Sequence, residues 1–178
     1  MGITGDGVRL LMREGNRRNF TGKVLQLGRQ EVLIDERNFK KIAREENFKL
    51  SEPKTTVEYG KSKFSNTVTL DDKFFFQGLG FEVVDSLDIC NFEDANITHD
   101  LNKLLEKTFK DIRTYSLVYD GGTLEHIFHV PNALKNIFDF LAVDGRVVHI
   151  CPMNHVNHGF YNFSPCFYED FYAENKFL

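Results

Sequence analysis

The chain has 178 residues, of which 42% are hydrophobic and 27% are charged. These fractions are typical of a globular domain and exclude a disordered or fibrous chain. The formal net charge is −4 and no basic segment is concentrated enough to bind nucleic acid, so we expect no nucleic-acid partner. Because the apolar segments are too short to cross a bilayer, we also expect no membrane partner. We therefore expect one domain over residues 1–178.

The cysteine content and the start of the chain bear on the compartment. Cys90, Cys151 and Cys166 are too few and too scattered to form a disulfide framework. The first residues lack the pattern of an export signal. Both features predict a protein of the reducing cytoplasm.

The first third of the chain predicts a helix, a strand, a second helix and a long connection. Residues 7–15 have the pattern of a short amphipathic helix, and residues 23–27 (KVLQL) have that of a strand that ends at Gly28. Residues 35–47 place their apolar side chains on one face, which predicts a surface helix. Residues 48–68 are polar and have no sustained period. They predict a connecting excursion with a short hairpin, and the pattern leaves open a functional lid or a mobile connection.

The next segment predicts a helix and the second strand. The sequence Thr-Leu-Asp-Asp fits a capping box between Thr69 and Asp72, and the helix that follows is expected to end at Gly80. Residues 81–87 (FEVVDSL) predict a strand that ends at Asp88.

The centre of the chain predicts a strand–helix–strand unit. Residues 115–119 predict a buried strand, Pro131 suits the first turn of a helix, and Gly145 suits the position after its end. Residues 146–150 predict a second buried strand, which makes a right-handed crossover. The apolar stripe of the helix consists of Ala133, Leu134, Ile137, Phe138 and Leu141.

Three weaker patterns complete the assignment. Residues 95–98 predict a short edge strand, residues 101–109 are weakly helical, and Ser164-Pro165 predicts the start of a last helix. About five strands then alternate with helices, a pattern typical of an α/β, Rossmann-like, doubly wound and mostly parallel sheet. Ligands of such sheets bind at the carboxyl ends of the strands.

Several short segments in this order resemble class I S-adenosylmethionine-dependent methyltransferases, and most closely a bacterial subgroup of methyltransferase-like proteins. Each segment is weak alone, but the ordered set spans most of the chain and is a fairly specific indication of the fold. The matching segments are residues 24–30 (VLQLGRQ), 86–88 (SLD) with 93–95 (EDA), 99–102 (HDLN), 120–126 (DGGTLEH) and 158–165 (HGFYNFSP).

The resemblance implies a cofactor site for S-adenosylmethionine. Gly28 would let the backbone approach the methionine part, and Asp88 would accept hydrogen bonds from the ribose hydroxyls. Asp100 would lie beside the adenine amino group. Asp120 and Gly121 would border the methyl group that is transferred.

The resemblance places the acceptor side at Glu125 and His126. Five of the histidines fall between residues 126 and 158, and a neutral imidazole there could act as a general base toward an acceptor hydroxyl or amine. We assign catalytic roles to His126, His158 and Glu125. A buried histidine bonded to backbone explains each histidine equally well on its own.

The first motif departs from the family pattern. Gln26 stands where the family has an acidic residue, and Arg29-Gln30 follows a single glycine where the family has several. Arg29 is a cation beside the expected sulfonium, although it could bind the cofactor carboxylate instead. The family fold also ends with an antiparallel strand pair, and this chain ends at Phe177-Leu178 where that pair would begin. The pair is therefore expected to be missing or truncated.

A metal site is a further interpretation of the histidines. His126 with His129, and His155 with His158, form two H-x-x-H pairs, and cysteines lie nearby in the sequence. Zinc needs three or four converging nitrogen or sulfur ligands. Because the order is not H-E-x-x-H, we assign no metal ligand.

Three functions are compatible with these patterns. The first is methyl transfer from S-adenosylmethionine to a small or sugar-like acceptor, with a second copy of the chain as a further candidate partner. The second is a binding or assembly module that keeps the methyltransferase fold without catalysis. The third and most distant is a histidine-rich metal hydrolase.

Overall fold

The structure is a computed structural model that describes residues 2–56, 59–61, 68–106 and 114–176. Its main sheet has five strands, all parallel, in the order β7-β6-β2-β8-β9. Of these five strands β2 is the first in the sequence, and it lies in the middle of the sheet. The strands β6 and β7 follow on one side of it, and β8 and β9 on the other. The strands are β2 (Lys23–Leu27), β6 (Val83–Asp88), β7 (Ile97–Thr98), β8 (Tyr115–Asp120) and β9 (Leu141–His149).

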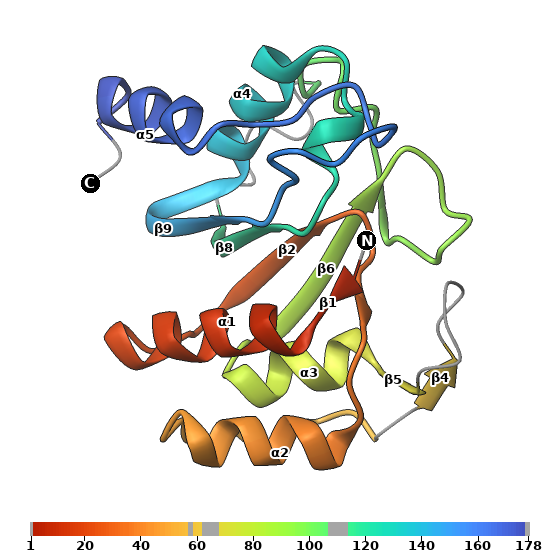
Figure 1. Ribbon diagram of the computed structural model, residues 1–178, viewed down its shortest axis with the longest axis vertical. Coiled ribbons are helices and arrows are strands. Elements are labelled where there is room, and N and C mark those ends of the chain that lie inside the picture. The colour runs from red at the N-terminus through yellow and green to blue at the C-terminus, as the bar shows by residue number, and fades with distance from the viewer. Residues whose placement is uncertain (1, 57–58, 62–67, 107–113, 177–178) are drawn as a thin grey trace.

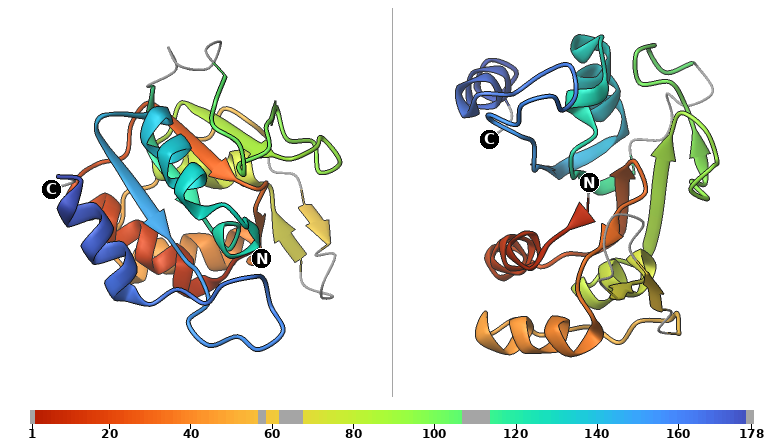
Figure 2. Two further views of the ribbon diagram at one scale, coloured as in Figure 1. Left: turned by 90° about the horizontal axis from the view of Figure 1, so that it is seen from above. Right: turned by 45° about the vertical axis from the view of Figure 1, so that its right-hand side comes forward.

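Helices cover both faces of this sheet, as an α/β layout requires (Figure 1). α1, α2 and α3 lie on one side and α4 and α5 on the other, and in the right-hand view of Figure 2 α2 and α5 lie at opposite ends of the molecule. The helices are α1 (Gly5–Arg17), α2 (Glu36–Glu45), α3 (Asp72–Leu79), α4 (Val130–Phe140) and α5 (Pro165–Glu174).

Two hydrophobic clusters fill the space between the sheet and its helices. The first contains the buried Phe39, Phe75 and Phe76, with the rings of Phe39 and Phe75 5.2 Å apart at their centroids. The second contains the buried Leu25 and Phe140. These phenylalanines, which are among the 18 of the chain, therefore serve core packing.

A second, smaller sheet was not predicted from the sequence. Its strand order is β1-β3-β5-β4, and the antiparallel pairing of β4 with β5 fits the short hairpin expected in the 48–68 excursion. Thr69 lies in β5, so the predicted capping box is wrong. Asp71 is the N-cap of α3, and its side chain accepts a hydrogen bond from Phe74 N at 2.9 Å. The strands are β1 (Gly2–Ile3), β3 (Glu31–Val32), β4 (Tyr59–Lys61) and β5 (Val68–Leu70).

The central unit is present, but its second half differs from the prediction. The helix α4 ends at Phe140, and Gly145 lies inside β9 rather than after the helix. Tyr115 pairs with Leu141 and Leu117 pairs with Arg146, so the residues between Leu141 and Arg146 bulge out of the ladder. As the last strand in the sheet order, β9 is mostly half-buried, and the expectation of a buried strand is wrong.

Smaller differences concern the ends of elements and one side chain. Phe138 of the predicted apolar stripe is 38% exposed. Residues 101–106 form a turn followed by a segment without regular structure instead of a helix, and the rest of that predicted helix lies outside the described residues, as do Phe177 and Leu178. In the described part of the chain, no helix combines the length and apolar character needed to cross a membrane.

Candidate functional site

The carboxyl ends of β2 and β6 bring Gly28 and Asp88 together. Gly28 has a φ of +66°, and its N–H donates to Leu87 O at 2.7 Å. A Cβ built on Gly28 would meet Thr123 Oγ1 at 2.9 Å and Gln30 Nε2 at 3.7 Å before Asp88 Oδ2 at 4.0 Å, so the half-buried carboxylate borders a turn that other side chains also line. The other carboxylate oxygen, Oδ1, accepts a hydrogen bond from Ile89 N at 2.6 Å. The structure thus places two predicted cofactor residues side by side.

Asp100 lies at the same edge of the sheet, just beyond β7. Its Oδ1 accepts hydrogen bonds from Asn102 N at 3.0 Å and from Asn102 Nδ2 at 2.9 Å. These bonds lower the pKa of Asp100 from its ordinary value. The strand ends are also linked, since His99 N donates to Asp88 O at 2.9 Å.

Arg29 is surrounded by carboxylates of the protein itself. Its guanidinium lies 3.0 Å from Asp72 and 3.6–3.7 Å from Asp94 and Asp71. Burial is the largest effect and lowers the pKa of Arg29, but the hydrogen bonds to Asp72 and the charges of the three carboxylates together raise it. Gln26 also donates to Asp72, at 2.7 Å. The arginine therefore has its counter-ion in α3, so the cofactor carboxylate is not needed to balance its charge.

Gln30 occupies the space between the ends of β2 and β8. The side chain of Gln30 is buried, and its Nε2 donates to Leu27 O at 3.0 Å and to Gly28 O at 3.2 Å. A Cβ added at Gly121 would collide with Gln30 Oε1. Gly121 therefore contacts a packed side chain here. The sequence named Gln30 only as part of a motif, since nothing in the pattern shows where a polar side chain folds back.

Asp120 ends β8 and is completely buried. Its Oδ1 accepts from the backbone N–H groups of Thr123 at 2.9 Å and Leu124 at 3.2 Å. Its Oδ2 accepts from His149 Nδ1 at 2.8 Å and from Cys151 Sγ at 3.2 Å. Burial alone would raise the pKa of Asp120, but the bonds from His149 and the backbone lower it. Asp120 is therefore an internal anchor of the loop that follows β8.

The hydrogen bonds of Asp120 continue into α5 through His149. The Nε2 atom of His149 lies 2.6 Å from Tyr172 Oη, and its ring stacks on Tyr168 with centroids 4.3 Å apart. Tyr168 Oη donates to Cys151 Sγ at 3.2 Å. Burial raises the pKa of Tyr168, Tyr172 and Cys151, so these groups stay protonated. Nothing in the sequence pattern of the last helix connects these tyrosines to Asp120.

The three residues predicted to be catalytic, Glu125, His126 and His158, lie together. Glu125 is completely buried in the short turn Leu124–His126, and His158 Nε2 lies 3.5 Å from Glu125 Oε1. The rings of His126 and His158 meet edge to face with centroids 4.8 Å apart. One ligand atom from each of the three residues falls within 4.8 Å of the others. Residues more than 30 positions apart thus form one polar cluster, which we call the Glu125 cluster.

The backbone fixes the two sides of the Glu125 cluster to each other. Phe160 N donates to Glu125 O at 2.7 Å, and Tyr161 N donates to the same oxygen at 3.3 Å. Gly159 has a φ of +66°, and a Cβ there would lie 2.7 Å from Glu125 O. A glycine is needed at this position both for its backbone conformation and for this close approach.

The remaining histidines divide between the Glu125 cluster and a helix end. The ring of His155 stacks on that of His158 with centroids 4.5 Å apart and an interplanar angle of 14°. His129 is instead the N-cap of α4, where its Nδ1 accepts from Asn132 N at 3.3 Å. The first H-x-x-H pair of the sequence, His126 with His129, therefore has one member in a capping role.

The aromatic and thiol side chains near the predicted site in the sequence differ in their exposure. Phe160 and Phe128 are 65% and 69% exposed, and their rings meet edge to face at 5.8 Å. Phe163 is buried in the second hydrophobic cluster. Cys90 and Cys166 are exposed free thiols.

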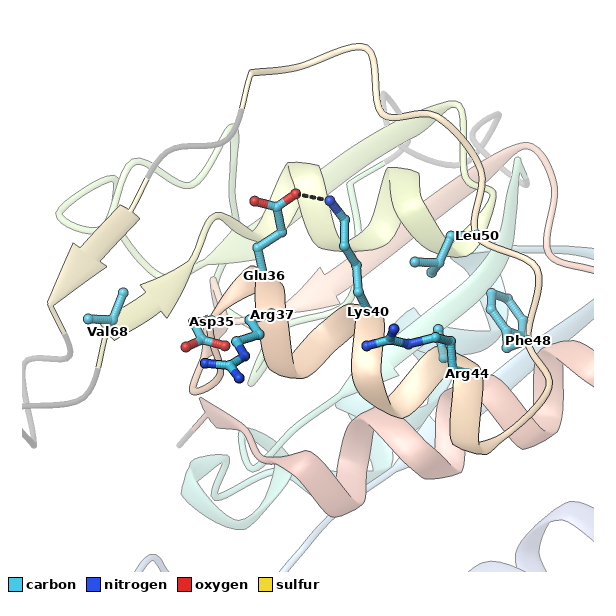
Figure 3. Close-up of a pocket in the computed structure, with 9 residues that line it drawn as sticks. Asp35, Glu36, Arg37, Lys40, Arg44, Phe48, Leu50 and Val68 are labelled. Carbon is cyan, nitrogen blue, oxygen red and sulfur yellow. Dashed lines mark ion pairs between the residues drawn. The ribbon is translucent and has the colours of Figure 1, made fainter.

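Two cavities lie away from the Gly28 turn and the Glu125 cluster, and the second of them borders the hydrogen-bond network of Asp120 at His149 and Tyr172. One of about 820 Å³ is bordered by α2, Phe48 and Leu50, with an ion pair of 2.5 Å between Lys40 and Glu36 at its edge (Figure 3). The other, of about 750 Å³, runs along β9 toward α1 and α5. Neither cavity is lined by a residue that the sequence assigned to the site.

The geometry therefore offers two places for chemistry at the carboxyl edge of the sheet. One is the turn at Gly28 and Asp88, and the other is the Glu125 cluster. Comparison of the chain with protein-family models, with curated proteins and with solved structures finds no match.

Proposed function

We propose that the protein binds S-adenosylmethionine at the carboxyl edge of a Rossmann-like sheet and transfers its methyl group to a small or sugar-like acceptor. The observation that carries this proposal is the pairing of Gly28 with Asp88 at adjacent strand ends. This pair lies beside β2, from which the strand order continues to β6 and β7 on one side and to β8 and β9 on the other. Crevices at points where the strand order reverses in this way bind nucleosides in open α/β sheets.

The residues around this turn suit a nucleoside. Asp88 Oδ2 faces the turn and could accept hydrogen bonds from both ribose hydroxyls, while Asp100 lies at the neighbouring strand end for the adenine amino group. The cofactor would supply a methyl group activated by a sulfonium charge. Such a transfer is an in-line displacement that depends mainly on alignment, with proton removal from the acceptor where needed. His126 and His158 are the groups that would accept this proton, and the exposed ring of Phe160 could stabilise a cation nearby.

Binding is tested by calorimetry with S-adenosylmethionine and S-adenosylhomocysteine. We expect both to bind the wild-type protein. Asp88→Ala should weaken both by about 10–100-fold, because charge-assisted hydrogen bonds contribute about 1.5–3 kcal/mol. Glu82→Ala is the matched control, since the exposed Glu82 precedes the opposite end of the same strand. Equal affinities of the Asp88 and Glu82 variants would show that the ribose site is elsewhere.

A binding or assembly module without catalysis is the second candidate. Two observations favour it: Gln30 is packed between Gly28 and Gly121, and Arg29 already has Asp72 as its counter-ion. This candidate predicts that neither cofactor gives heat with the wild-type protein. If Gln30→Ala then binds the cofactor, the side chain closes an intact crevice; if it does not, the cofactor site has been lost.

We place this activity in the cytoplasm, in keeping with the three free cysteines. The acceptor is proposed to be a small molecule, because the chain carries a net charge of −4 and no concentrated basic segment for nucleic acid.

A further inference from the structure

Glu125 is exceptional among the acidic residues that the structure describes. Its side chain has no exposure to solvent, and neither carboxylate oxygen has a hydrogen-bond partner within the described residues. Asp120 is equally buried, but it accepts four hydrogen bonds. A buried carboxylate without hydrogen bonds is costly unless it is neutralised by a proton or bound to a cation.

The group facing Glu125 is also incompletely bonded. The Nε2 atom of His158 is buried and has no hydrogen-bond partner in the described chain, and it lies 3.5 Å from Glu125 Oε1. His126 completes the set from the exposed side, since one ligand atom of each residue lies within 4.8 Å of the others. Buried polar atoms that have no partner in the described chain and lie close together are suited to bind an ion.

We propose that Glu125, His126 and His158 bind a divalent transition-metal ion, with Zn²⁺ as the preferred ion. Two imidazole nitrogens and one carboxylate oxygen are ligands that zinc accepts. A tetrahedral zinc ion needs donor atoms about 3.4 Å apart, so modest side-chain rotations would close this set on the ion. Three protein ligands leave the fourth position for water or for an oxygen of a small molecule. The proposal does not depend on cofactor binding; with the ion bound, water in the fourth position would replace the two imidazoles as the group that takes a proton from an acceptor.

The scaffold around the Glu125 cluster suits a metal site. The two hydrogen bonds to Glu125 O hold the loop of His158 against the turn that carries Glu125 and His126. By contrast, the similar group Asp120, His149 and Cys151 is already bonded: the carboxylate accepts bonds from both partners, and His149 Nε2 lies 2.6 Å from Tyr172 Oη. Of these two groups, the Glu125 cluster is the one whose donors are free to bind an ion.

The experiment measures metal binding by the full chain. Protein freed of metal with a chelator is titrated with Zn²⁺ in a calorimeter, and thermal unfolding is followed with and without the ion. We expect one ion per chain and a higher melting temperature, because binding to the folded state alone stabilises it. Co²⁺ should give visible absorption bands of a tetrahedral site. Absence of both stoichiometric Zn²⁺ binding and a thermal shift would overturn the proposal.

Variants locate the ion. Glu125→Gln keeps the size of the side chain, and we expect it, His126→Asn and His158→Asn each to weaken Zn²⁺ binding at least about 100-fold, since even residues behind the ligands contribute 10–100-fold. His129→Asn is the control, because His129 caps α4 and asparagine is a good N-cap. Circular dichroism establishes that each variant folds. Zinc binding that survives Glu125→Gln and both histidine changes unaltered would assign the ion to other residues and overturn the proposal.

Discussion

Asp120 shows how one side chain can hold three segments together. It joins the loop after β8 to His149 of β9 and to Cys151. An asparagine there has only one acceptor oxygen. Its N–H₂ group would therefore face either the two backbone N–H donors or the donors His149 and Cys151. We expect Asp120→Asn to lower the free energy of unfolding by about 2–4 kcal/mol in urea denaturation. Asp170→Asn, on the exposed face of α5, is the control and should have little effect.

The stability supplied by Asp120 should depend on pH in a defined direction. Because the pKa of Asp120 is lowered on folding, its contribution is complete above the unfolded pKa of about 4 and is lost as the pH falls through the folded value. The difference in unfolding free energy between wild type and Asp120→Asn should therefore shrink below about pH 4. A difference that stays constant from pH 7 to pH 3 would contradict this account.

Gly159 permits the close approach on which the Glu125 cluster depends. Alanine there would combine an unfavourable positive φ with a contact of 2.7 Å to Glu125 O. We expect Gly159→Ala to destabilise the protein by about 1–3 kcal/mol in chemical denaturation. Gly5→Ala is the matched change, since its Cβ would meet Ile42 at an ordinary 3.8 Å within α1. Similar losses for the two variants would show that the Gly159 contact is not tight.

At the scale of elements, two helix starts that look alike in sequence differ in the structure. Asp35 caps α2, and its side chain accepts from Asn38 N at 2.7 Å, whereas Ser164 at the N-cap of α5 makes no such bond. We expect Asp35→Ala to lower the unfolding free energy by about 1 kcal/mol and Ser164→Ala to change it much less. Equal losses measured by urea denaturation would show that the cap bond of Asp35 contributes nothing.

The sequence predicted elements best where a long pattern determined them. The strand over residues 23–27 and the helix over residues 35–47 were found because apolar spacing and end signals agreed. Gly145 misled the prediction, because it is close to the helix end but serves the bulge of β9, where a Cβ would lie 3.0 Å from Tyr115 O. The strands β1 and β3 were not predicted, because each has only two residues and so shows no periodicity. They also pair with each other across a long stretch of the chain.

The site was predictable in part for the same reason. The motif around residues 120–126 pointed to Glu125 and His126, and the structure brings His158 to them. The sequence paired the histidines by spacing, as His126 with His129, but a loop returning from β9 pairs His126 with His158 instead. Contacts made by a returning loop depend on tertiary structure, and so does the position of Gln30 in the crevice.

At the scale of the whole molecule, the central strands join the two hydrophobic clusters. Val24 of β2 belongs to the first cluster and its neighbour Leu25 to the second, because successive side chains of a strand point to opposite faces. Leu117 and Val118 of β8 alternate in the same way. Loss of packing on either face therefore loosens strands that support the other.

This arrangement predicts a single unfolding transition, as expected for one domain. Phe75→Leu and Phe140→Leu, each at a fully buried position of a different cluster, should each lower the unfolding free energy by about 1–2 kcal/mol. Each should shift the urea midpoint equally by circular dichroism and by tyrosine fluorescence, which is not masked by tryptophan in this chain. Midpoints that separate between the two probes would show that the faces unfold independently.

The placement of the three thiols makes the folded protein chemically distinguishable from the unfolded one. Cys90, two residues past Asp88, and Cys166, at the start of α5, are open to an alkylating reagent, whereas burial keeps Cys151 protonated and therefore unreactive. A dye attached to Cys90 would stand next to the proposed ribose site and report its occupancy. Modification of Cys151, detected by mass spectrometry, would mark those molecules in which the packing of β9 against α5 has opened.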